Sequence, residues 1–208
     1  MWGLYDEPFM EFFLEKISEF SQPFLATVFT LSSHHPFEVP EKYKGRFPEG
    51  PIPICETIGY TDYVLRKFFR DAESKPWFEN TLFVITADHT NEKIHREYQN
   101  SYGQFSVPIL FYMTNSRLKG IMPEIAQQID IMPSLLSYLN YDREYIAFGN
   151  NLFDDTKESF GFNTFGNTYY LFMRNHVLEM IANKTVAVYN FKTDRMQETN
   201  LESKLPGL

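Results

Sequence analysis

The chain has 208 residues, 43% of them hydrophobic and 17% aromatic, which is enough to bury the core of one sizeable domain. Its formal net charge of −8 argues against a nucleic-acid-binding protein, because such proteins normally carry a basic face. No apolar run reaches the ~18–20 residues that span a bilayer. The first residues lack the basic and apolar regions of a signal peptide, so we expect this chain to be soluble.

The first quarter of the chain predicts a helix, a strand and a long loop. Residues 6–20 have helical apolar spacing, and Asp6 can cap the helix. Residues 23–31 form a near-continuous apolar run, which predicts a strand buried on both faces. The proline-rich residues 32–56 predict a loop, and long loops in compact domains are often functional.

Further along, helical and strand patterns alternate. A second amphipathic helix and two apolar strands are expected at residues 57–72, 81–87 and 107–113. Helices are also expected near Pro123 and over residues 133–139, the latter capped around Asp130. Helices that alternate with buried strands predict an α/β fold with a mainly parallel sheet and helices on both faces.

The character of the sequence changes after residue 150. Short apolar segments separated by turn residues predict strands at residues 168–173, 177–181 and 185–191. Asn183 and Lys184 lie between the last two segments as a hairpin-like turn. We therefore expect an α/β portion at residues 1–150 and a small antiparallel subdomain at residues 151–208.

The adjacent residues Asp88 and His89 follow the strand expected at residues 81–87. Ligand sites of open α/β sheets lie beyond the carboxyl ends of strands. A carboxylate and an imidazole together suit Zn²⁺ or Mn²⁺. Neighbours in a regular strand point to opposite faces, so both can bind one ion only if the chain leaves the pleat. The alternative is an aspartate that merely caps a helix.

Three segments resemble the alkaline phosphatase/sulfatase superfamily. Residues 82–89, Leu-Phe-Val-Ile-Thr-Ala-Asp-His, look like its metal-binding strand end. Residues 128–136 resemble the helix start D-I-x-P-T/S-L-L of sulfatases, and residues 188–201 resemble the C-terminal ending of the same enzymes. Residues 31–37, Leu-Ser-Ser-His-His-Pro-Phe, and residues 2–7 are similar to lipoteichoic acid synthases and related phosphoglycerol transferases.

The resemblance implies an enzyme in which a threonine bound to a divalent cation attacks a phosphodiester and forms a covalent phospho-enzyme. Asp88 and His89 would be metal ligands, with Mn²⁺ the expected ion and Zn²⁺ or Ca²⁺ the alternatives. His34 would contact the substrate phosphate or the leaving group, although His34 and His35 can also simply bond loop carbonyls. The family's catalytic domains lie outside the cytoplasm, often on a membrane anchor.

The chain also departs from the family pattern. The family's nucleophile and first acidic ligand lie upstream of the region that begins at Trp2, and Cys55 is not followed by the Pro-Ser-Arg of true sulfatases. We therefore expect the C-terminal part of a longer enzyme, which would be inactive alone and whose membrane anchor would lie in the missing N-terminal part. Its substrate would be a phosphate or sulfate ester, such as a lipid or glycan ester. The alternatives are a sulfuric ester hydrolase and a non-catalytic binding module that retains the fold.

Overall fold

The computed structural model describes residues 3–116 and 119–204. The chain forms two compact units. Unit 1 comprises Met1–Phe83 and Tyr112–Arg117, and unit 2 comprises Val84–Phe111 and Leu118–Leu208. The division at residue 150 expected from the strand pattern stays a prediction. In the part of the chain that the structure describes, no helix is long and apolar enough to cross a membrane.

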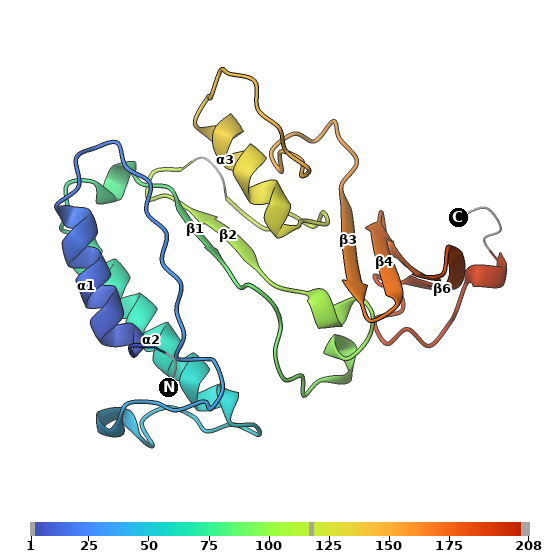
Figure 1. Ribbon diagram of the computed structural model, residues 1–208, viewed down its shortest axis with the longest axis horizontal. Helices are drawn as coiled ribbons and strands as arrows, with labels where there is room; N and C mark the ends of the chain where they lie inside the picture. Colours follow the sequence, from blue (N-terminus) through green and yellow to red (C-terminus); the bar gives the residue numbers. More distant parts are fainter. Residues whose placement is uncertain (1–2, 117–118, 205–208) are drawn as a thin grey trace. The chain divides into compact units, whose positions relative to one another are not determined.

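Unit 1 is built on two helices, α1 (Asp6–Ser18) and α2 (Ile54–Ala72), which pack side by side (Figure 1). Both helices match the predicted periodicity, although α1 ends two residues early and α2 begins three residues early. Two short 3₁₀ turns, Glu41–Tyr43 and Phe78–Asn80, flank α2 along the chain. The core between these elements is rich in aromatic rings and includes Met10, Ile17, Tyr43, Tyr60, Val64, Phe68, Trp77 and Phe78.

Residues 23–31 differ from the prediction. They run without regular secondary structure and are assigned to no strand in the described chain. Phe24 and Val28 pack against the core of unit 1, whereas Leu25 and Phe29 are 87% and 60% exposed. The prediction of a strand buried on both faces is therefore wrong here. A strand requires a hydrogen-bonded neighbour, and an apolar run by itself does not specify one.

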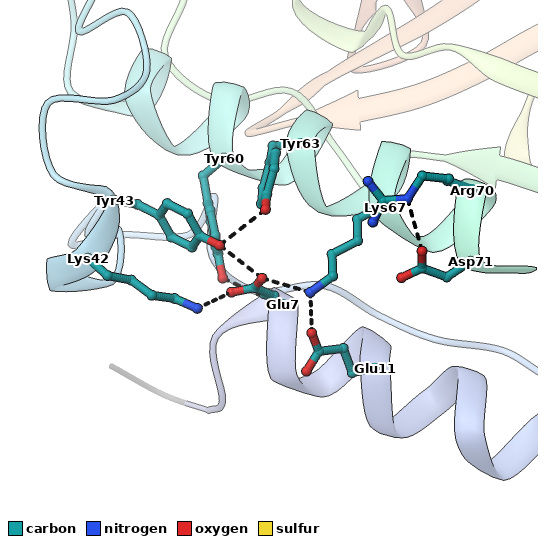
Figure 2. Close-up of polar contacts among 9 residues, drawn as sticks. All are labelled: Glu7, Glu11, Lys42, Tyr43, Tyr60, Tyr63, Lys67, Arg70 and Asp71. Atoms are coloured by element: carbon teal, nitrogen blue, oxygen red, sulfur yellow. Dashed lines mark hydrogen bonds and ion pairs between the residues drawn. The ribbon is translucent and has the colours of Figure 1, made fainter.

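Two adjacent carboxylates, Asp6 and Glu7, are buried at the start of α1. The N-cap of α1 is Tyr5, so Asp6 does not cap the helix as predicted. Burial by itself would raise the pKa of Glu7, but hydrogen bonds from Lys42, Lys67 and Tyr43 outweigh burial and lower the pKa to about 2 (Figure 2). Glu7 thus stays ionised although its side chain is only 6% exposed.

We expect acid to destabilise unit 1 through Glu7. Its folded pKa of about 2 lies below the ordinary value of 4.5, so its stabilisation is fully present above pH 4.5 and disappears as the pH falls towards 2. Glu7→Gln should lower the free energy of unfolding at pH 7 by on the order of 2 kcal/mol. This loss is smaller than the full pKa shift implies, because solvent screens the contribution of the exposed Lys42 to the interaction. Thermal unfolding between pH 7 and 2 measures this loss. An unchanged pH slope in the variant would contradict it, and Glu11→Gln, with a 55% exposed carboxylate, is the control.

Unit 2 contains most of a two-stranded sheet, β1 (Phe83–Thr86) and β2 (Ile109–Tyr112), and the helix α3 (Ile131–Tyr138) (Figure 1). The α/β class is confirmed. β1 and β2 lie within predicted segments, whereas α3 begins two residues before the helix predicted over residues 133–139. The parallel character of the main sheet stays a prediction. The helix expected near Pro123 is not formed in the described residues 119–127. Regular structure resumes there with the 3₁₀ turn Gln128–Asp130.

The C-terminal antiparallel sheet is confirmed. It runs in the order β3-β4-β5-β6, with the strands Phe160–Phe165, Thr168–Met173, His176–Ile181 and Lys184–Asn190. The sequence analysis had identified the last three strands but not β3. The β5–β6 turn consists of Ala182 and Asn183, both with positive φ, one residue earlier than predicted. Positive φ at two successive residues is the geometry of a tight type I′ hairpin, which asparagine tolerates well.

Candidate metal half-site and substrate-histidine loop

Asp88 and His89 lie in a bend directly after β1, where the chain has left the strand. Asp88 Oδ2 and His89 Nε2 are 3.3 Å apart, so the two side chains converge instead of pointing to opposite faces. Both side chains are well exposed, at 52% and 69%. The exit from the pleat that one shared ion would require is therefore present.

The second ring nitrogen of His89 has its own partner. Nδ1 lies 2.7 Å from the carbonyl oxygen of Thr90. A carbonyl can only accept a hydrogen bond, so Nδ1 carries the proton and donates it to Thr90. In the neutral ring, Nε2 then carries the lone pair, and it is the nitrogen that lies 3.3 Å from Asp88 Oδ2. This is the usual arrangement of a metal-binding histidine, whose other nitrogen donates to a carbonyl or a carboxylate.

The backbone of Asp88 is fixed from the start of α3. Gln128 Nε2 donates to the carbonyl oxygens of Ala87 and Asp88, at 3.3 and 3.0 Å. Next along the chain, the hydroxyl of Thr90 donates to the carbonyl oxygen of Gln104 and closes the loop that follows His89. These contacts determine where the chain turns out of β1. Neither Gln128 nor Thr90 is among the site residues predicted from the sequence, although Gln128 begins the segment 128–136 and Thr90 directly follows His89.

Asp130 explains the resemblance at residues 128–136. It is 3% exposed, and its two carboxylate oxygens accept the backbone amides of Gln127 and Asn150, at 2.8 and 2.7 Å. It stands at the N-cap of α3 as expected, but its side chain does not cap that helix. A Cβ atom at Gly149 would lie 2.6 Å from Asp130 Oδ1, so the approach of this loop requires glycine. The motif is thus a structural anchor next to the Asp88 turn.

The C-terminal motif is also structural. Asn190, Asp194 and Asn200 each accept two or more backbone amides through their side-chain oxygens. The turn that Asp194 forms contacts the loop after His89, because Gln197 Oε1 accepts from the amide and hydroxyl of Ser101. The motif therefore supports residues 90–105 and supplies no chemical group to the half-site.

His34 belongs to unit 1, whereas Asp88 and His89 belong to unit 2. His34 is exposed and lies between two tight turns, since its amide donates to Leu31 O and its carbonyl accepts from Phe37 N. Its Nδ1 lies 2.9 Å from the carbonyl oxygen of His35. The ring thus has one nitrogen against the loop backbone.

The donor set fits half of a metal site. One carboxylate and one neutral imidazole suit a divalent cation such as Mn²⁺ or Zn²⁺. Within residues 3–116 and 119–204, no group of three or more His, Cys, Asp or Glu side chains could hold a metal.

The sequence profile of the sulfatase family matches residues 2–141 of the chain. The chain belongs to the sulfatase family. Its relatives include lipoteichoic acid synthases: lipoteichoic acid synthase 1 of Bacillus subtilis is 30% identical over 177 residues. That match covers 74% of this chain and 27% of the relative. The lipoteichoic acid synthase of Staphylococcus aureus strain USA300 is 26% identical over 168 residues, covering 73% of this chain and 26% of that relative.

Solved structures agree on the fold of this sulfatase-family chain. The lipoteichoic acid synthase LtaP from Listeria monocytogenes superposes with a TM-score of 0.78 at 18% identity, covering 98% of this chain and 55% of that chain. An alkaline phosphatase superfamily protein from Vibrio parahaemolyticus superposes with a TM-score of 0.76 at 24% identity, covering 97% and 50%. The chain therefore spans about a quarter of the curated relatives and about half of the solved chains.

Replacing Asp130 should destabilise unit 2. Asp130→Ala leaves two backbone amides without their buried acceptor, so we expect a loss of roughly 3 kcal/mol in the free energy of unfolding. Urea denaturation measures this loss. Asp155→Ala, which removes an exposed aspartate of the same unit, is the control and should change stability by less than about 0.5 kcal/mol. Equal effects of the two substitutions would refute the anchoring role of Asp130.

Proposed function

We propose that this chain is the C-terminal part of a metal-dependent sulfatase-family enzyme that acts on phosphodiesters in the manner of a phosphoglycerol transferase. The observation that carries the proposal is the convergence of Asp88 Oδ2 and His89 Nε2 at 3.3 Å, with the histidine tautomer set by Thr90. The relatedness to lipoteichoic acid synthases supports the choice of phosphodiester chemistry.

In this proposal Asp88 and His89 bind one divalent cation, with Mn²⁺ expected and Zn²⁺ or Ca²⁺ as alternatives. When bound, such a cation lowers the pKa of a coordinated hydroxyl and neutralises charge on phosphoryl oxygens. Asp88 supplies the negative charge of the pair, and His89 supplies a neutral nitrogen whose orientation depends on Thr90. Gln128 fixes the backbone from which the carboxylate projects.

His34 is the proposed substrate-binding residue. A hydroxyl nucleophile, which we place on a threonine outside this chain, forms the new bond to phosphorus while the bond to the leaving oxygen breaks. His34 can donate a hydrogen bond to a phosphate oxygen or a proton to that leaving oxygen. This chain alone would then bind the substrate phosphate without turning it over.

The proposed partner is a phosphate ester carried on a lipid or a glycan. The lipoteichoic acid synthases among the relatives support a setting at the extracytoplasmic face of the cell membrane for the complete protein. An anchor, where the complete protein has one, would belong to its N-terminal part.

Metal binding tests the half-site directly. Titration of this chain with Mn²⁺, followed by the loss of the free-ion electron paramagnetic resonance signal, should reveal one weak site. Asp88→Ala should weaken that site by roughly tenfold or more, whereas Asp62→Ala, which removes an exposed aspartate of α2, should leave the affinity unchanged. Equal affinity in the wild type and Asp88→Ala would reject Asp88 as a ligand.

The reaction class needs the complete gene product. We expect Mn²⁺-dependent cleavage of bis(p-nitrophenyl) phosphate in preference to p-nitrophenyl sulfate. We also expect His34→Ala to raise KM or slow turnover while Mn²⁺ affinity is unchanged. Preferential cleavage of the sulfate ester would instead establish a sulfuric ester hydrolase. The absence of both activities, together with intact ester binding, would establish a non-catalytic module.

A further inference from the structure

We propose that Asp6 and Glu7 are positioning residues for His34, because they fix the chain on both sides of the loop that carries it. This inference rests on the proposed role of His34 in binding phosphate. The two carboxylates are adjacent in the first turn of α1, and they are 1% and 5% exposed. Neither was singled out as a site residue by the sequence, and neither belongs to the metal half-site.

Asp6 fixes the chain just before His34. Its Oδ1 accepts the backbone amides of Leu31 and Ser32, at 2.9 and 3.0 Å. In return the hydroxyl of Ser32 accepts the amide of Asp6, at 3.0 Å. Thr61 of α2 donates to the other carboxylate oxygen, at 3.1 Å. The carboxylate therefore joins α1, α2 and the residues that lead into the loop.

Glu7 fixes the chain after the loop. Its carboxylate accepts from Lys42 Nζ at 2.6 Å and from the hydroxyl of Tyr43 at 2.9 Å (Figure 2). From α2, Lys67 Nζ donates to the same carboxylate at 3.0 Å. The hydroxyl of Tyr60 accepts the amide of Glu7, also at 3.0 Å. Residues 42–43 are thereby attached to the same helix turn as residues 31–32.

The two attachments enclose only nine residues, 33–41, and His34 is the second of them. Residues 31–37 add two internal turns, closed by the amides of His34 and Phe37. The His34 side chain itself is exposed. Because both ends of the loop are anchored, ordering the loop around a phosphate would cost less conformational entropy.

Charge also favours this arrangement over a neutral anchor. A carboxylate forms stronger hydrogen bonds with backbone amides than a neutral oxygen does. Asp6→Asn preserves the shape of the side chain and removes that charge, so the substitution tests the carboxylate itself. Glu7→Gln does the same for the second attachment, where Lys42 and Lys67 would lose their ionised partner.

The experiment is amide hydrogen exchange on this chain, followed residue by residue by nuclear magnetic resonance. In Asp6→Asn and Glu7→Gln, the amides of His34 and Phe37 should exchange roughly tenfold faster than in the wild type. The amides of Val64 and Phe68 in α2 report general unfolding. Exchange at His34 and Phe37 that stays independent of low urea concentrations, unlike exchange at Val64 and Phe68, separates loop release from general unfolding. Ser32→Ala removes one bond of the Asp6 pair, so it makes the same prediction if Asp6→Asn fails to fold.

Two matched substitutions are the controls. Glu11→Gln removes the exposed carboxylate that also pairs with Lys67, and Asp62→Asn removes an exposed carboxylate next to Thr61. Neither carboxylate contacts residues 31–43 in any hydrogen bond of the described chain, so neither substitution should alter the loop. Exchange at His34 and Phe37 that is equal in the tested and control variants would overturn the positioning role.

A second readout separates this inference from the proposed function. With sn-glycerol 1-phosphate as the probe, the imidazole resonances of His34 should shift in the wild type and in both controls. Asp6→Asn should weaken that response roughly fivefold or more. If the imidazole resonances of His34 in the wild-type chain do not shift with sn-glycerol 1-phosphate, the substrate-binding role of His34 is refuted. The exchange data would still decide whether Asp6 and Glu7 order the loop.

Discussion

A buried carboxylate that accepts two backbone amides is the interaction on which both units of this protein depend. In unit 1, Asp6 accepts the amides of Leu31 and Ser32. In unit 2, Asp130 accepts those of Gln127 and Asn150. Each carboxylate would be costly to bury alone, but charge-assisted hydrogen bonds from amides that also need partners offset that cost. The result in each unit is irregular backbone with a defined position, next to a candidate functional residue.

The need to position irregular backbone explains why several family-like segments contain no reactive group. The segment around Asp130 and the one ending at Asn200 both satisfy backbone amides, and both lie near the chain that follows β1. Within the described residues of these segments, Asp88 and His89 present donor atoms that converge. A motif can therefore identify a family through its supporting framework, while the chemistry depends on a few exposed side chains.

The sequence predicted elements whose signal is local. The apolar spacing of α1 and α2, the strand before Asp88 and the last three strands of the antiparallel sheet all follow from residues close together in the chain. It could not predict long-range partners: Asp6 meets Ser32 and Thr61 across 26 and 55 residues, and no periodicity encodes those pairs. For residues 23–31 the pattern reported apolarity correctly but could not report whether another strand pairs with them.

The order in which the units are threaded has a consequence for synthesis. Unit 1 is interrupted in sequence, since residues 84–111 belong to unit 2 before the chain returns at Tyr112. The ring of Tyr112 then packs against Phe69 and Phe83, with centroids 5.8 and 6.1 Å apart. On the ribosome, Phe69 and Phe83 therefore gain this ring contact only after residue 112 has emerged. The segment that carries Asp88 and His89 is thus synthesised before unit 1 can make its contacts with Tyr112.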